Sequence, residues 1–574
     1  MATAEVAAPL APGVSLTRRL LEAAPGGRSY AGLQAADKAW HALCNSAPSV
    51  PRQVIQEVSR PLEDRSLDHY DVVVLGGTLG IFMATALRLR NYSVLVLERN
   101  ELRGRDQDWN ISRADMKVFS DLGVLTSQEV DELITIEFNP VRIALAGSAE
   151  IVTEDILNCG VCPNAVLKRV KYRFLAEGGK LIEGAAFDAA TVHTDAARID
   201  FTVREQPAAT SGGAGGEGSV MYTSYTSEQP RDVQASVAAR VVVDAMGAWS
   251  PIAAQARRGA PPDSVVLMVG SCASGLPAPS AADLLCSFTP LNRERKLQYF
   301  WEAFPAVDGL TTYMFAYADP KPGRASLEDM YEDYLRLLPR YRQCQDLEGV
   351  QVQRAVFGYV PNWHDQPLAP LTSRLLQIGD AAGNRSALSF AGFGALARHL
   401  GRLTEALDAA LQTGQLGRGA LALLQPHSPA TSLTAAMQYS MGTRMGQDFE
   451  NCNPDIINNY IGSSFGQMKD LGESVYRPFM QDYLQFGSLA RIVGGQLVRQ
   501  PQDIVAMTLF MRSAKAGQMF ASQFTLLGIY AALHRLSELV DPAHRWLLQP
   551  FPGLLFRWNG LVEAFRVRKV HFRS

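Results

Sequence analysis

Three glycines and one glutamate lie between residues 70 and 100 at a spacing that could serve chemistry. The segment reads YDVVVLGGTLGIFMATALRLRNYSVLVLERN: Gly76, Gly77 and Gly80 follow one apolar run, and Glu98 ends the next. Glycines at the start of a helix let an anion approach free backbone N–H groups at the positive end of the helix dipole. An acid at the tip of the following strand can accept hydrogen bonds from a ribose. These residues therefore indicate a nucleotide site.

The glycine spacing departs from the strict G-x-G-x-x-G pattern of a dinucleotide-binding loop. Counting from Gly76 places Thr78 and Ile81 at the second and third glycine positions, and counting back from Gly80 places Leu75 at the first. The order of strand, glycines, helix, strand and acid is nevertheless the one that a dinucleotide fold requires. The glycine loop is weak evidence by itself, and the acid at the strand tip strengthens it.

Two distant segments carry turns of the same kind. They are ARVVVDAMGAWSP, residues 239–251, and RLLQIGDAAGNRSALSFAGFGALARHL, residues 374–400. Their candidate residues are Asp244 and Gly247 in the first segment, and Gly379, Asp380 and Gly383 in the second. In the second segment an apolar strand leads directly into a glycine-dotted turn that opens a helix. Backbone N–H groups at such a turn can face a pyrophosphate or an anionic reduced isoalloxazine.

Taken in order, the three segments resemble the FAD signatures of the flavoprotein superfamily that includes aromatic hydroxylases, geranylgeranyl reductases and lycopene cyclases. The second family signature, D-A-x-G-x-x-S, matches Asp244 to Ser250, and the third places a Gly-Asp pair, here Gly379 and Asp380, beside the ribityl chain. The resemblance implies an α/β fold of the Rossmann-like FAD-binding type. FAD is the implied cofactor, with NADPH as one candidate reductant of the flavin. Arg113, in WNISR, falls where related flavoproteins use an arginine near the pyrophosphate, and a helix-surface arginine is the alternative.

A narrower resemblance is to the bacterial-type lycopene cyclases and their plastid paralogues, the CruA/CruP type. It rests on GGTLGIFMATALRLRNYSVLVLERNELRGRDQDWNISR, SAEIVTEDILNCGV, YMFAYADP and GDAAGNRSALSFAGFGALARHL. It implies a redox-neutral, acid-initiated cyclisation of a polyene end group, assisted by reduced FAD. The implied substrate is a carotenoid or another polyisoprenoid. The implied location is the stromal side of a plastid membrane, with the cytoplasm as the alternative.

A predicted β-hairpin supplies the substrate side. KLQYFWEAFP and GLTTYMFAYADP flank an Asp-Gly turn at 308–309. The period of two along a strand places Tyr313, Phe315, Tyr317 and Asp319 on one face. Cyclisation needs a proton donor for a terminal alkene, aromatic or anionic groups around a carbocation, and then a proton acceptor. Aromatic faces near a cation contribute about 0.5 to 2 kcal/mol each.

Asp319 is the predicted acid, Tyr317 is its aromatic neighbour, and Glu302 on the adjoining strand is a second acid candidate. The sequence FAYAD departs from the Phe-Leu-Glu-Glu-Thr motif that other lycopene cyclases carry at about this place. One alternative is that the aromatic residues are sheet core and Asp319 begins a turn. Two functional alternatives also stay open: a flavin-dependent reductase or oxygenase of a carotenoid or polyisoprenoid, and a non-catalytic flavin-binding regulatory or assembly protein.

The elements that must position these residues divide the chain into four parts. We expect an FAD-binding domain from residues 67–134, 160–262 and 350–425, an interleaved β-sheet substrate domain from 135–159 and 263–349, and a helical C-terminal region from 426–574. The Ala- and Pro-rich residues 1–66 are either a transit remnant or a plain surface extension. Pro163 and the Gly178-Gly179 pair predict a helix between them. A Gly/Ser-rich loop, 207–219, separates two predicted hairpin strands.

Composition excludes several other classes of function. The formal charge of −3, from 57 acidic and 54 basic residues, gives no overall field for nucleic acid, and no basic patch with interleaved aromatics predicts such binding. Seven cysteines are too sparse for a disulfide framework, which indicates a reducing compartment. Cys159 and Cys162 form one CGVC without a second ligand pair, so no metal site is expected. The oligomeric state is left open.

The C-terminal end predicts peripheral membrane attachment. RWLLQPFPGLLFRWNGLVEAFRVRKVHFRS, from residue 545, interleaves aromatic and aliphatic residues with basic ones, which suits a headgroup boundary. A terminal helix packed on its own domain is the alternative. The longest uncharged run, Ala516 to Leu533, contains several polar residues and is interpreted as a buried or interfacial helix.

Overall fold

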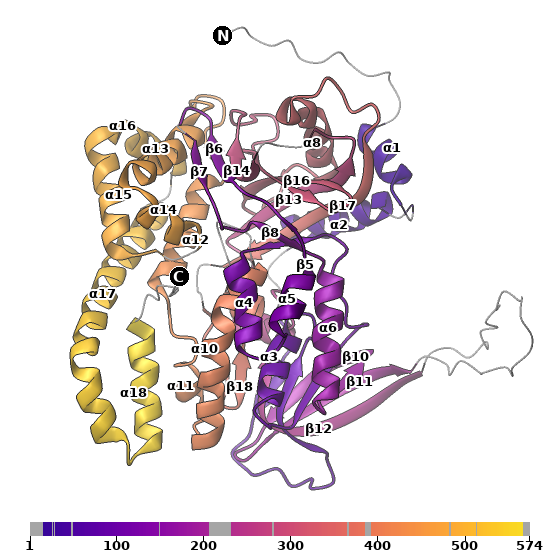
Figure 1. Ribbon diagram of the computed structural model, residues 1–574, viewed down its shortest axis with the longest axis vertical. Helices are drawn as coiled ribbons and strands as arrows, with labels where there is room; N and C mark the ends of the chain where they lie inside the picture. The colour runs from indigo at the N-terminus through magenta and orange to yellow at the C-terminus, as the bar shows by residue number, and fades with distance from the viewer. Residues whose placement is uncertain are drawn as a thin grey trace, which may run out of the picture.

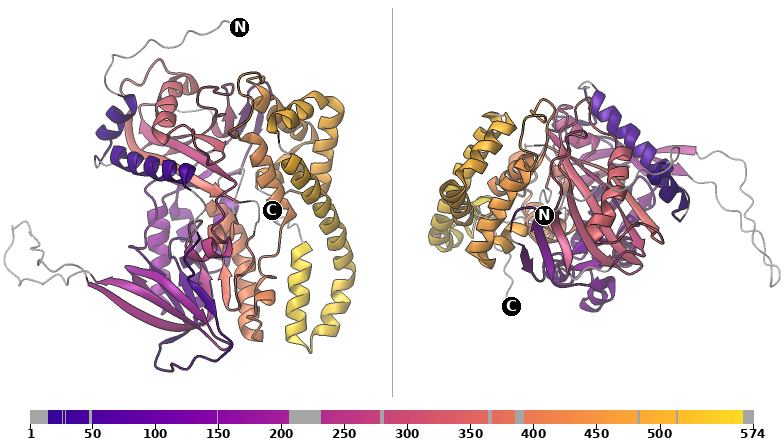
Figure 2. Two further views of the ribbon diagram at one scale, coloured as in Figure 1. Left: turned by 180° about the vertical axis from the view of Figure 1, so that it is seen from behind. Right: turned by 90° about the horizontal axis from the view of Figure 1, so that it is seen from above.

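Two large β-sheets and a layer of helices organise the protein (Figure 1). The computed structural model describes residues 15–25, 27, 29–46, 50–148, 150–205, 231–277, 281–363, 367–384, 392–481, 484–512 and 514–565. An eight-stranded sheet lies at one end of the long axis and a seven-stranded sheet at the other, and the C-terminal helices run along one side of both (Figures 1 and 2).

The eight-stranded sheet has a parallel centre. Its order is β1-β10-β11-β12-β2-β3-β9, with β18 also paired to β12. The strands are β1 (Ile55–Glu57), β2 (His69–Leu75), β3 (Val94–Glu98), β9 (Lys180–Glu183), β10 (Ala185–Val192), β11 (Ala197–Glu205), β12 (Arg231–Asp244) and β18 (Leu375–Gln377). The strands β18, β12, β2, β3 and β9 run parallel, so their carboxyl ends lie at one edge. Val72 to Leu75 are fully buried, as parallel strands covered on both faces require.

The seven-stranded sheet has the order β17-β13-β16-β15-β14-β6-β7. Its strands are β6 (Val141–Leu145), β7 (Ile151–Thr153), β13 (Ser264–Ser274), β14 (Ala282–Ser287), β15 (Phe300–Ala306), β16 (Gly309–Ala318) and β17 (Gln351–Asn362). β15 and β16 are antiparallel and close at Ala306 and Gly309, so the predicted hairpin is confirmed. β17 pairs with β13, so residues 351–362 belong to this sheet and the expected boundary at residue 350 is corrected.

Alternation along β16 separates two hydrophobic cores. Tyr313, Phe315 and Tyr317 enter the core shared with the C-terminal helices, as the period of two predicts. The intervening Met314 and Ala316 enter a second core under α8 (Leu327–Arg342) and the N-terminal helices. The hairpin therefore presents its aromatic side chains toward the interior of the molecule.

A smaller unit joins the two sheets. β4 (Trp109–Ile111), β5 (Ile134–Glu137) and β8 (Cys159–Val161) form a three-stranded sheet. Around it lie α3 (Gly80–Arg88), α4 (Arg113–Asp121), α5 (Ser127–Leu133), α6 (Pro163–Ala176) and α10 (Gly392–Thr413). α6 begins with a proline and ends before Gly178, which confirms the helix predicted there. A buried ion pair, Arg398 Nη1 to Asp115 Oδ2 at 2.9 Å, fixes α10 to α4.

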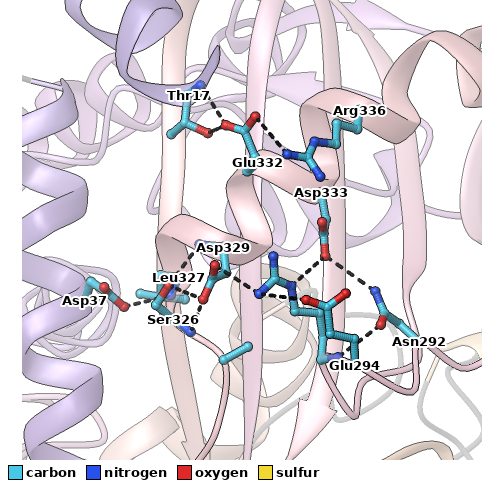
Figure 3. Close-up of polar contacts among 12 residues, drawn as sticks. Thr17, Asp37, Asn292, Glu294, Ser326, Leu327, Asp329, Glu332, Asp333 and Arg336 are labelled. Carbon is cyan, nitrogen blue, oxygen red and sulfur yellow. Dashed lines mark hydrogen bonds and ion pairs between the residues drawn. The ribbon is translucent and has the colours of Figure 1, made fainter. Parts of the chain in front are cut away.

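Residues 15–57 are part of the fold, which corrects the expectation of a plain surface extension over this range, whereas a transit remnant stays a prediction. Within residues 15–57, α1 (Leu16–Ala23) and α2 (Ser29–Asn45) cover α8 and β17, and β1 joins the eight-stranded sheet. Thr17 donates to Glu332 at 2.8 Å, and Asp37 accepts from the backbone N–H of Leu327 at 2.7 Å (Figure 3). Leu33 and Trp40 are buried in the core below these contacts. Residues 1–14 lie outside the described part of the chain.

The C-terminal region is helical, as predicted. After the short α11 (Arg418–Leu421), its helices are α12 (Pro429–Met441), α13 (Ile456–Leu471), α14 (Glu473–Met480), α15 (Phe486–Arg499), α16 (Pro501–Met511), α17 (Ala514–Leu548) and α18 (Pro552–Phe565). The uncharged run from Ala516 lies within α17, which packs against α12 and α18. Within the described residues, no helix combines the length and the apolar character that crossing a bilayer requires.

Two predictions concern segments that border or lie outside the described residues. β11 and β12 pair as far as Glu205 and Arg231, which confirms the two hairpin strands, whereas the predicted loop 207–219 lies outside the described residues. The basic residues from Arg566 onward also lie outside them.

Cys159 is buried in β8, and burial raises the pKa of its thiol to about 12, which makes it a poor nucleophile or metal ligand.

Candidate functional site

The parallel strands bring the three glycine-bearing segments to one edge of the eight-stranded sheet. Leu75, the last residue of β2, is paired with Leu97 of β3 on one side and with Asp244 of β12 on the other. Asp244 is paired in turn with Gln377 of β18. Segments that lie about 300 residues apart in the sequence therefore begin their turns side by side. In open α/β sheets this edge, beyond the carboxyl ends of the strands, is where ligands bind.

The first glycine loop is shaped by close contacts that leave no room for side chains. A Cβ atom at Gly76, where φ is +91°, would lie 2.7 Å from the carbonyl oxygen of Ala245. At Gly77 it would lie 2.6 Å from Leu102 Cδ1, and at Gly80 it would lie 2.7 Å from Val74 Cγ1. Gly80 is the first residue of α3, so the loop leads directly to a helix N-terminus. Gly76 and Gly80 thus pack against Ala245 of the second segment, and Gly77 packs against Leu102.

Glu98 lies beside this loop. Its Oε2 accepts a hydrogen bond from the backbone N–H of Gly77 at 2.7 Å, and its Oε1 accepts one from Asn100 at 3.1 Å. The acid at the tip of β3 is therefore positioned at the glycines, as the sequence order suggested. Its role toward a ribose stays a prediction.

Asp244 holds the second turn from inside. Its carboxylate is fully buried, accepts from Ser250 Oγ at 2.6 Å and from the backbone N–H of Met246 at 3.1 Å. Burial raises the pKa of Asp244 to about 6. Ser250 in turn caps α7 (Pro251–Ala256). Through these contacts Asp244 stabilises the turn. Gly247 has φ of +79°, and a Cβ atom there would meet no atom within 4 Å, so its backbone is accessible.

The third turn combines accessible backbone with a buried side-chain amide that has no hydrogen-bond partner among the described residues. Gly379 and Gly383 have φ of +55° and +79°, and a Cβ atom at either would meet no atom within 4 Å. Asp380 lies between them in the short helix α9 (Gly379–Ala382). Among the described residues, the buried side-chain amide of Gln377 has no hydrogen-bond partner for its nitrogen or its oxygen. Gln377 is a candidate ligand contact that the sequence analysis did not identify.

These features could hold a nucleotide cofactor. The glycine loop and the N-terminus of α3 suit a pyrophosphate, and Glu98 suits a ribose. The turns at Gly247 and Gly379 leave backbone accessible on the neighbouring strands, and Gln377 supplies a buried donor and acceptor. The residues present therefore fit FAD. Within the described ranges, no group of His, Cys, Asp or Glu side chains could hold a metal ion.

Arg113 forms ion pairs with two acidic side chains in the structure. Its guanidinium binds Asp131 at 2.6 Å and Glu137 at 3.0 Å, and about half of its side chain is exposed. It occupies the first position of α4. These contacts match the helix-surface alternative, and a role at a pyrophosphate stays a prediction.

Asp319 occupies a structural ion pair. Its carboxylate is buried against the guanidinium of Arg324 and also accepts from the backbone N–H of Met445 at 3.2 Å. Arg324 further binds the backbone carbonyl of Thr443 at 2.6 Å, so the pair ties the end of β16 to the segment after α12. A guanidinium and a backbone N–H thus hold the Asp319 carboxylate in place, which favours the alternative of a structural turn residue.

Glu302 is the buried acid of the aromatic hairpin. It lies on β15 with 5% of its surface exposed, and its Oε1 accepts from Asn110 Nδ2 at 2.5 Å. Burial raises the pKa of Glu302 to about 8, against the smaller lowering effects of the Asn110 hydrogen bond and the Arg105 charge. At neutral pH this carboxyl group is mostly protonated. The second acid candidate of the sequence analysis thus has the properties of a proton donor.

Aromatic rings surround Glu302 on the same face of the sheet. Tyr313 is directly opposite Glu302 in the strand register. Phe300 stacks near Phe315 with centroids 5.8 Å apart, and Phe304 meets Tyr313 edge-on at 5.9 Å. We call Phe300, Glu302, Phe304, Tyr313, Phe315 and Tyr317 the aromatic wall.

Residues 107–110, which lead into β4, contact the aromatic wall on one side and the start of α10 on the other. Gln107 is buried and donates to Thr311 at 3.1 Å, and its side chain lies next to the Tyr313 hydroxyl. Trp109 packs on Phe393 at the start of α10 with ring centroids 4.4 Å apart. Gln107 and Asn110 are not among the predicted site residues, although both lie in the polar run DQDWN.

Comparison with known proteins supports the fold. No protein-family model matches the sequence, and no curated protein matches it. A geranylgeranyl bacteriochlorophyll reductase-like protein from Thermoplasma acidophilum superposes with a TM-score of 0.50 at 12% identity, covering 76% of this chain and 98% of its own.

Two further structures are similar at lower scores. The halogenase PltM, in complex with phloroglucinol and FAD, has a TM-score of 0.48 at 11% identity, covering 86% of this chain and 96% of its own. PqsL from Pseudomonas aeruginosa, a probable FAD-dependent monooxygenase, has a TM-score of 0.43 at 15% identity, covering 65% and 97%. The predicted fold class is confirmed: the chain has the Rossmann-like α/β fold of the geranylgeranyl reductase-like flavoproteins.

Proposed function

We propose that this protein is an FAD-dependent enzyme that acts on a carbon–carbon double bond of an apolar polyisoprenoid. One observation carries the proposal: Glu302, a buried acid with a raised pKa, stands in an aromatic wall contacted by Asn110. The neighbouring Trp109 packs on Phe393, which packs on Phe82 of α3, the helix that begins at Gly80. An alkene is apolar and needs a proton donor to react as an electrophile. The wall provides both an apolar surface and the donor.

The cofactor is assigned to the sheet edge. Gly76, Gly77, Gly80 and Glu98 would hold the adenosine diphosphate half of FAD, and the turns at Gly247 and Gly379 to Gly383 would hold the rest. When bound and reduced, FAD supplies hydride or an electron-rich ring. The superposition on a reductase-like protein supports this assignment through the fold. NADPH as the reductant of the flavin is part of the proposal.

Glu302 supplies the proton. Asn110 donates to Oε1, so the acidic hydrogen is placed on Oε2, which is free to transfer it to an alkene carbon. The O–H bond breaks, a C–H bond forms, and a carbocation and the Glu302 carboxylate result. The faces of Tyr313, Phe300 and Phe315 can stabilise that cation by about 0.5 to 2 kcal/mol each. Tyr313 and Gln107 offer further polar atoms beside the carboxylate.

Two fates of the cation define the two candidate reactions. If it gains a hydride, the product is the reduced isoprenoid, two hydrogens heavier than the substrate. The fold likeness to a reductase-like protein favours this fate. If a neighbouring double bond closes on the cation and a proton leaves, the product is a ring of unchanged mass. The aromatic wall with its acid, and the lycopene-cyclase resemblance of the sequence, favour this second candidate.

Product analysis in deuterium oxide tests the proposal. Reduced holoprotein is incubated without oxygen with lycopene and, separately, with a geranylgeranyl lipid, and the products are analysed by mass spectrometry. Acid initiation places one solvent deuterium in the product in either fate. Reduction adds a second one, because the N5 hydrogen of a reduced flavin exchanges with solvent. The mass and the number of deuterium atoms therefore distinguish reduction from cyclisation. Glu302→Gln should lose both products while retaining FAD.

Other products would contradict the proposal. Oxygenated product formed in air, unaffected by Glu302→Gln, would show an oxygenase without an acid step. No turnover of any carotenoid or isoprenoid by FAD-loaded protein would favour the non-catalytic alternative.

A further inference from the structure

The exposed apolar side chains of this protein are concentrated on its last helices. Twelve of the twenty large hydrophobic residues that are exposed in the described structure lie between residues 497 and 561. They are Leu497, Val498, Val505, Leu509, Ile529, Leu536, Leu539, Trp546, Leu547, Phe551, Leu554 and Leu561. We call this set the C-terminal face. Apolar patches of this kind on a folded protein mark interaction sites.

The C-terminal face lies on one side of the molecule. α15 to α18 form an outer layer opposite the N-terminal helices in both orientations (Figures 1 and 2). On α17, Ile529, Leu536, Leu539 and Trp546 recur at spacings of three and seven residues and form one stripe. Leu527 and Ser537, which point inward, are buried. The stripe is therefore the solvent side of a helix whose other side is already packed.

Charge identifies the kind of surface that this face fits. Residues 486–565 contain seven Lys and Arg and four Asp and Glu, a formal net charge of +3. The preceding residues contain 43 basic and 53 acidic residues, a net charge of −10. A second copy of the chain would bring two positive regions together. An anionic lipid surface instead complements both the charge and the exposed aliphatic and aromatic side chains.

We propose that the C-terminal face docks on an anionic lipid bilayer surface. Trp546 and Phe551, 74% and 57% exposed at the end of α17 and in the turn that follows it, would enter the headgroup boundary, where aromatic side chains are favoured. The aliphatic stripe of α17 would lie along that boundary. The assignment does not depend on the reaction, because it concerns a surface on the far side of the helical layer from the sheets.

Vesicle flotation of the full-length protein tests the proposal. Vesicles of phosphatidylcholine are compared with vesicles that also contain phosphatidylglycerol, at low and high salt. The double variant Leu539→Gln/Trp546→Gln removes exposed apolar groups and keeps good helix formers. Tyr172→Gln/Leu175→Gln, exposed on α6, is the matched control. Binding should need phosphatidylglycerol, weaken with salt, and fall at least tenfold in the first variant only.

Three results would overturn the proposal. One is equal flotation of both variants, and another is absence of flotation on anionic vesicles. The third is a dimer in sedimentation analysis that Leu539→Gln/Trp546→Gln dissociates, because a second copy would then cover the face. None of these readouts involves turnover, so they are independent of the proposed reaction.

Discussion

Replacing Glu302 by glutamine should make the protein more stable at neutral pH while it removes the proton donor. The ordinary pKa of this carboxyl is 4.5, and burial raises it to about 8 in the folded protein. The folded state therefore binds a proton that the unfolded state releases between these values. Stability from this group is complete below pH 4.5 and declines as the pH rises toward 8.

The magnitude follows from the pKa difference. At pH 7 the pH lies about 2.5 units above the pKa of the carboxyl in the unfolded chain, so this group is ionised there. Its ionisation lowers the free energy of unfolding by about 3 kcal/mol. Glutamine keeps an oxygen for the Asn110 hydrogen bond and does not titrate. We expect Glu302→Gln to exceed the wild type by up to about 3 kcal/mol in unfolding free energy at pH 7 and to equal it near pH 4.

Urea unfolding of both proteins between pH 4 and 8 measures this difference directly. An infrared difference spectrum of the wild type minus the variant should also show a protonated carboxyl band that disappears as the pH passes about 8. Turnover, where a substrate is found, should fall by about 10²- to 10⁴-fold in the variant. A stability difference that does not change with pH would refute the assignment of a buried neutral acid.

Three further predictions address other parts of the site. Asp319→Asn leaves Arg324 as a buried charge without its carboxylate partner and should lower the unfolding free energy by about 3 to 5 kcal/mol, measured by urea unfolding; an unchanged midpoint would contradict the structural ion pair. Gly77→Val should abolish FAD retention, measured as flavin released on denaturation, because its side chain would collide with Leu102 and fill the loop; full occupancy would contradict the nucleotide site. The activity of the wild type should decline above about pH 8 as Glu302 ionises, and a profile that rises through pH 8 would exclude it as the acid.

The sequence predicted the elements whose signals are local. Val72 to Leu75 read as a buried strand, and Pro163 and Gly178 delimited a helix, because apolar runs, proline and glycine act over a few residues. The turn at 308–309 predicted the hairpin for the same reason. The order of three glycine-bearing segments was sufficient for the fold class.

Long-range contacts explain what the sequence did not predict. Nothing near Asp319 indicates that Arg324 and the backbone of Met445 would enclose it, and nothing near Glu302 indicates that Asn110 would cover it. Strand pairing likewise placed residues 351–362 in the seven-stranded sheet, since a strand's partner is set by the tertiary fold. The ranking of the two acids therefore depended on the fold.

The docking of the N-terminal helices onto α8 has a consequence for synthesis of the chain. Asp37 caps a backbone N–H at Leu327, 290 residues later, and Trp40 is covered by the same contact surface. During translation, α1 and α2 leave the ribosome long before α8 and β17 exist. The apolar faces of these two helices therefore stay exposed until α8 and β17 have been synthesised. Fragments that stop before Ala325 lack both Ala325 and Tyr359, which contact Trp40, and we expect them to aggregate during expression.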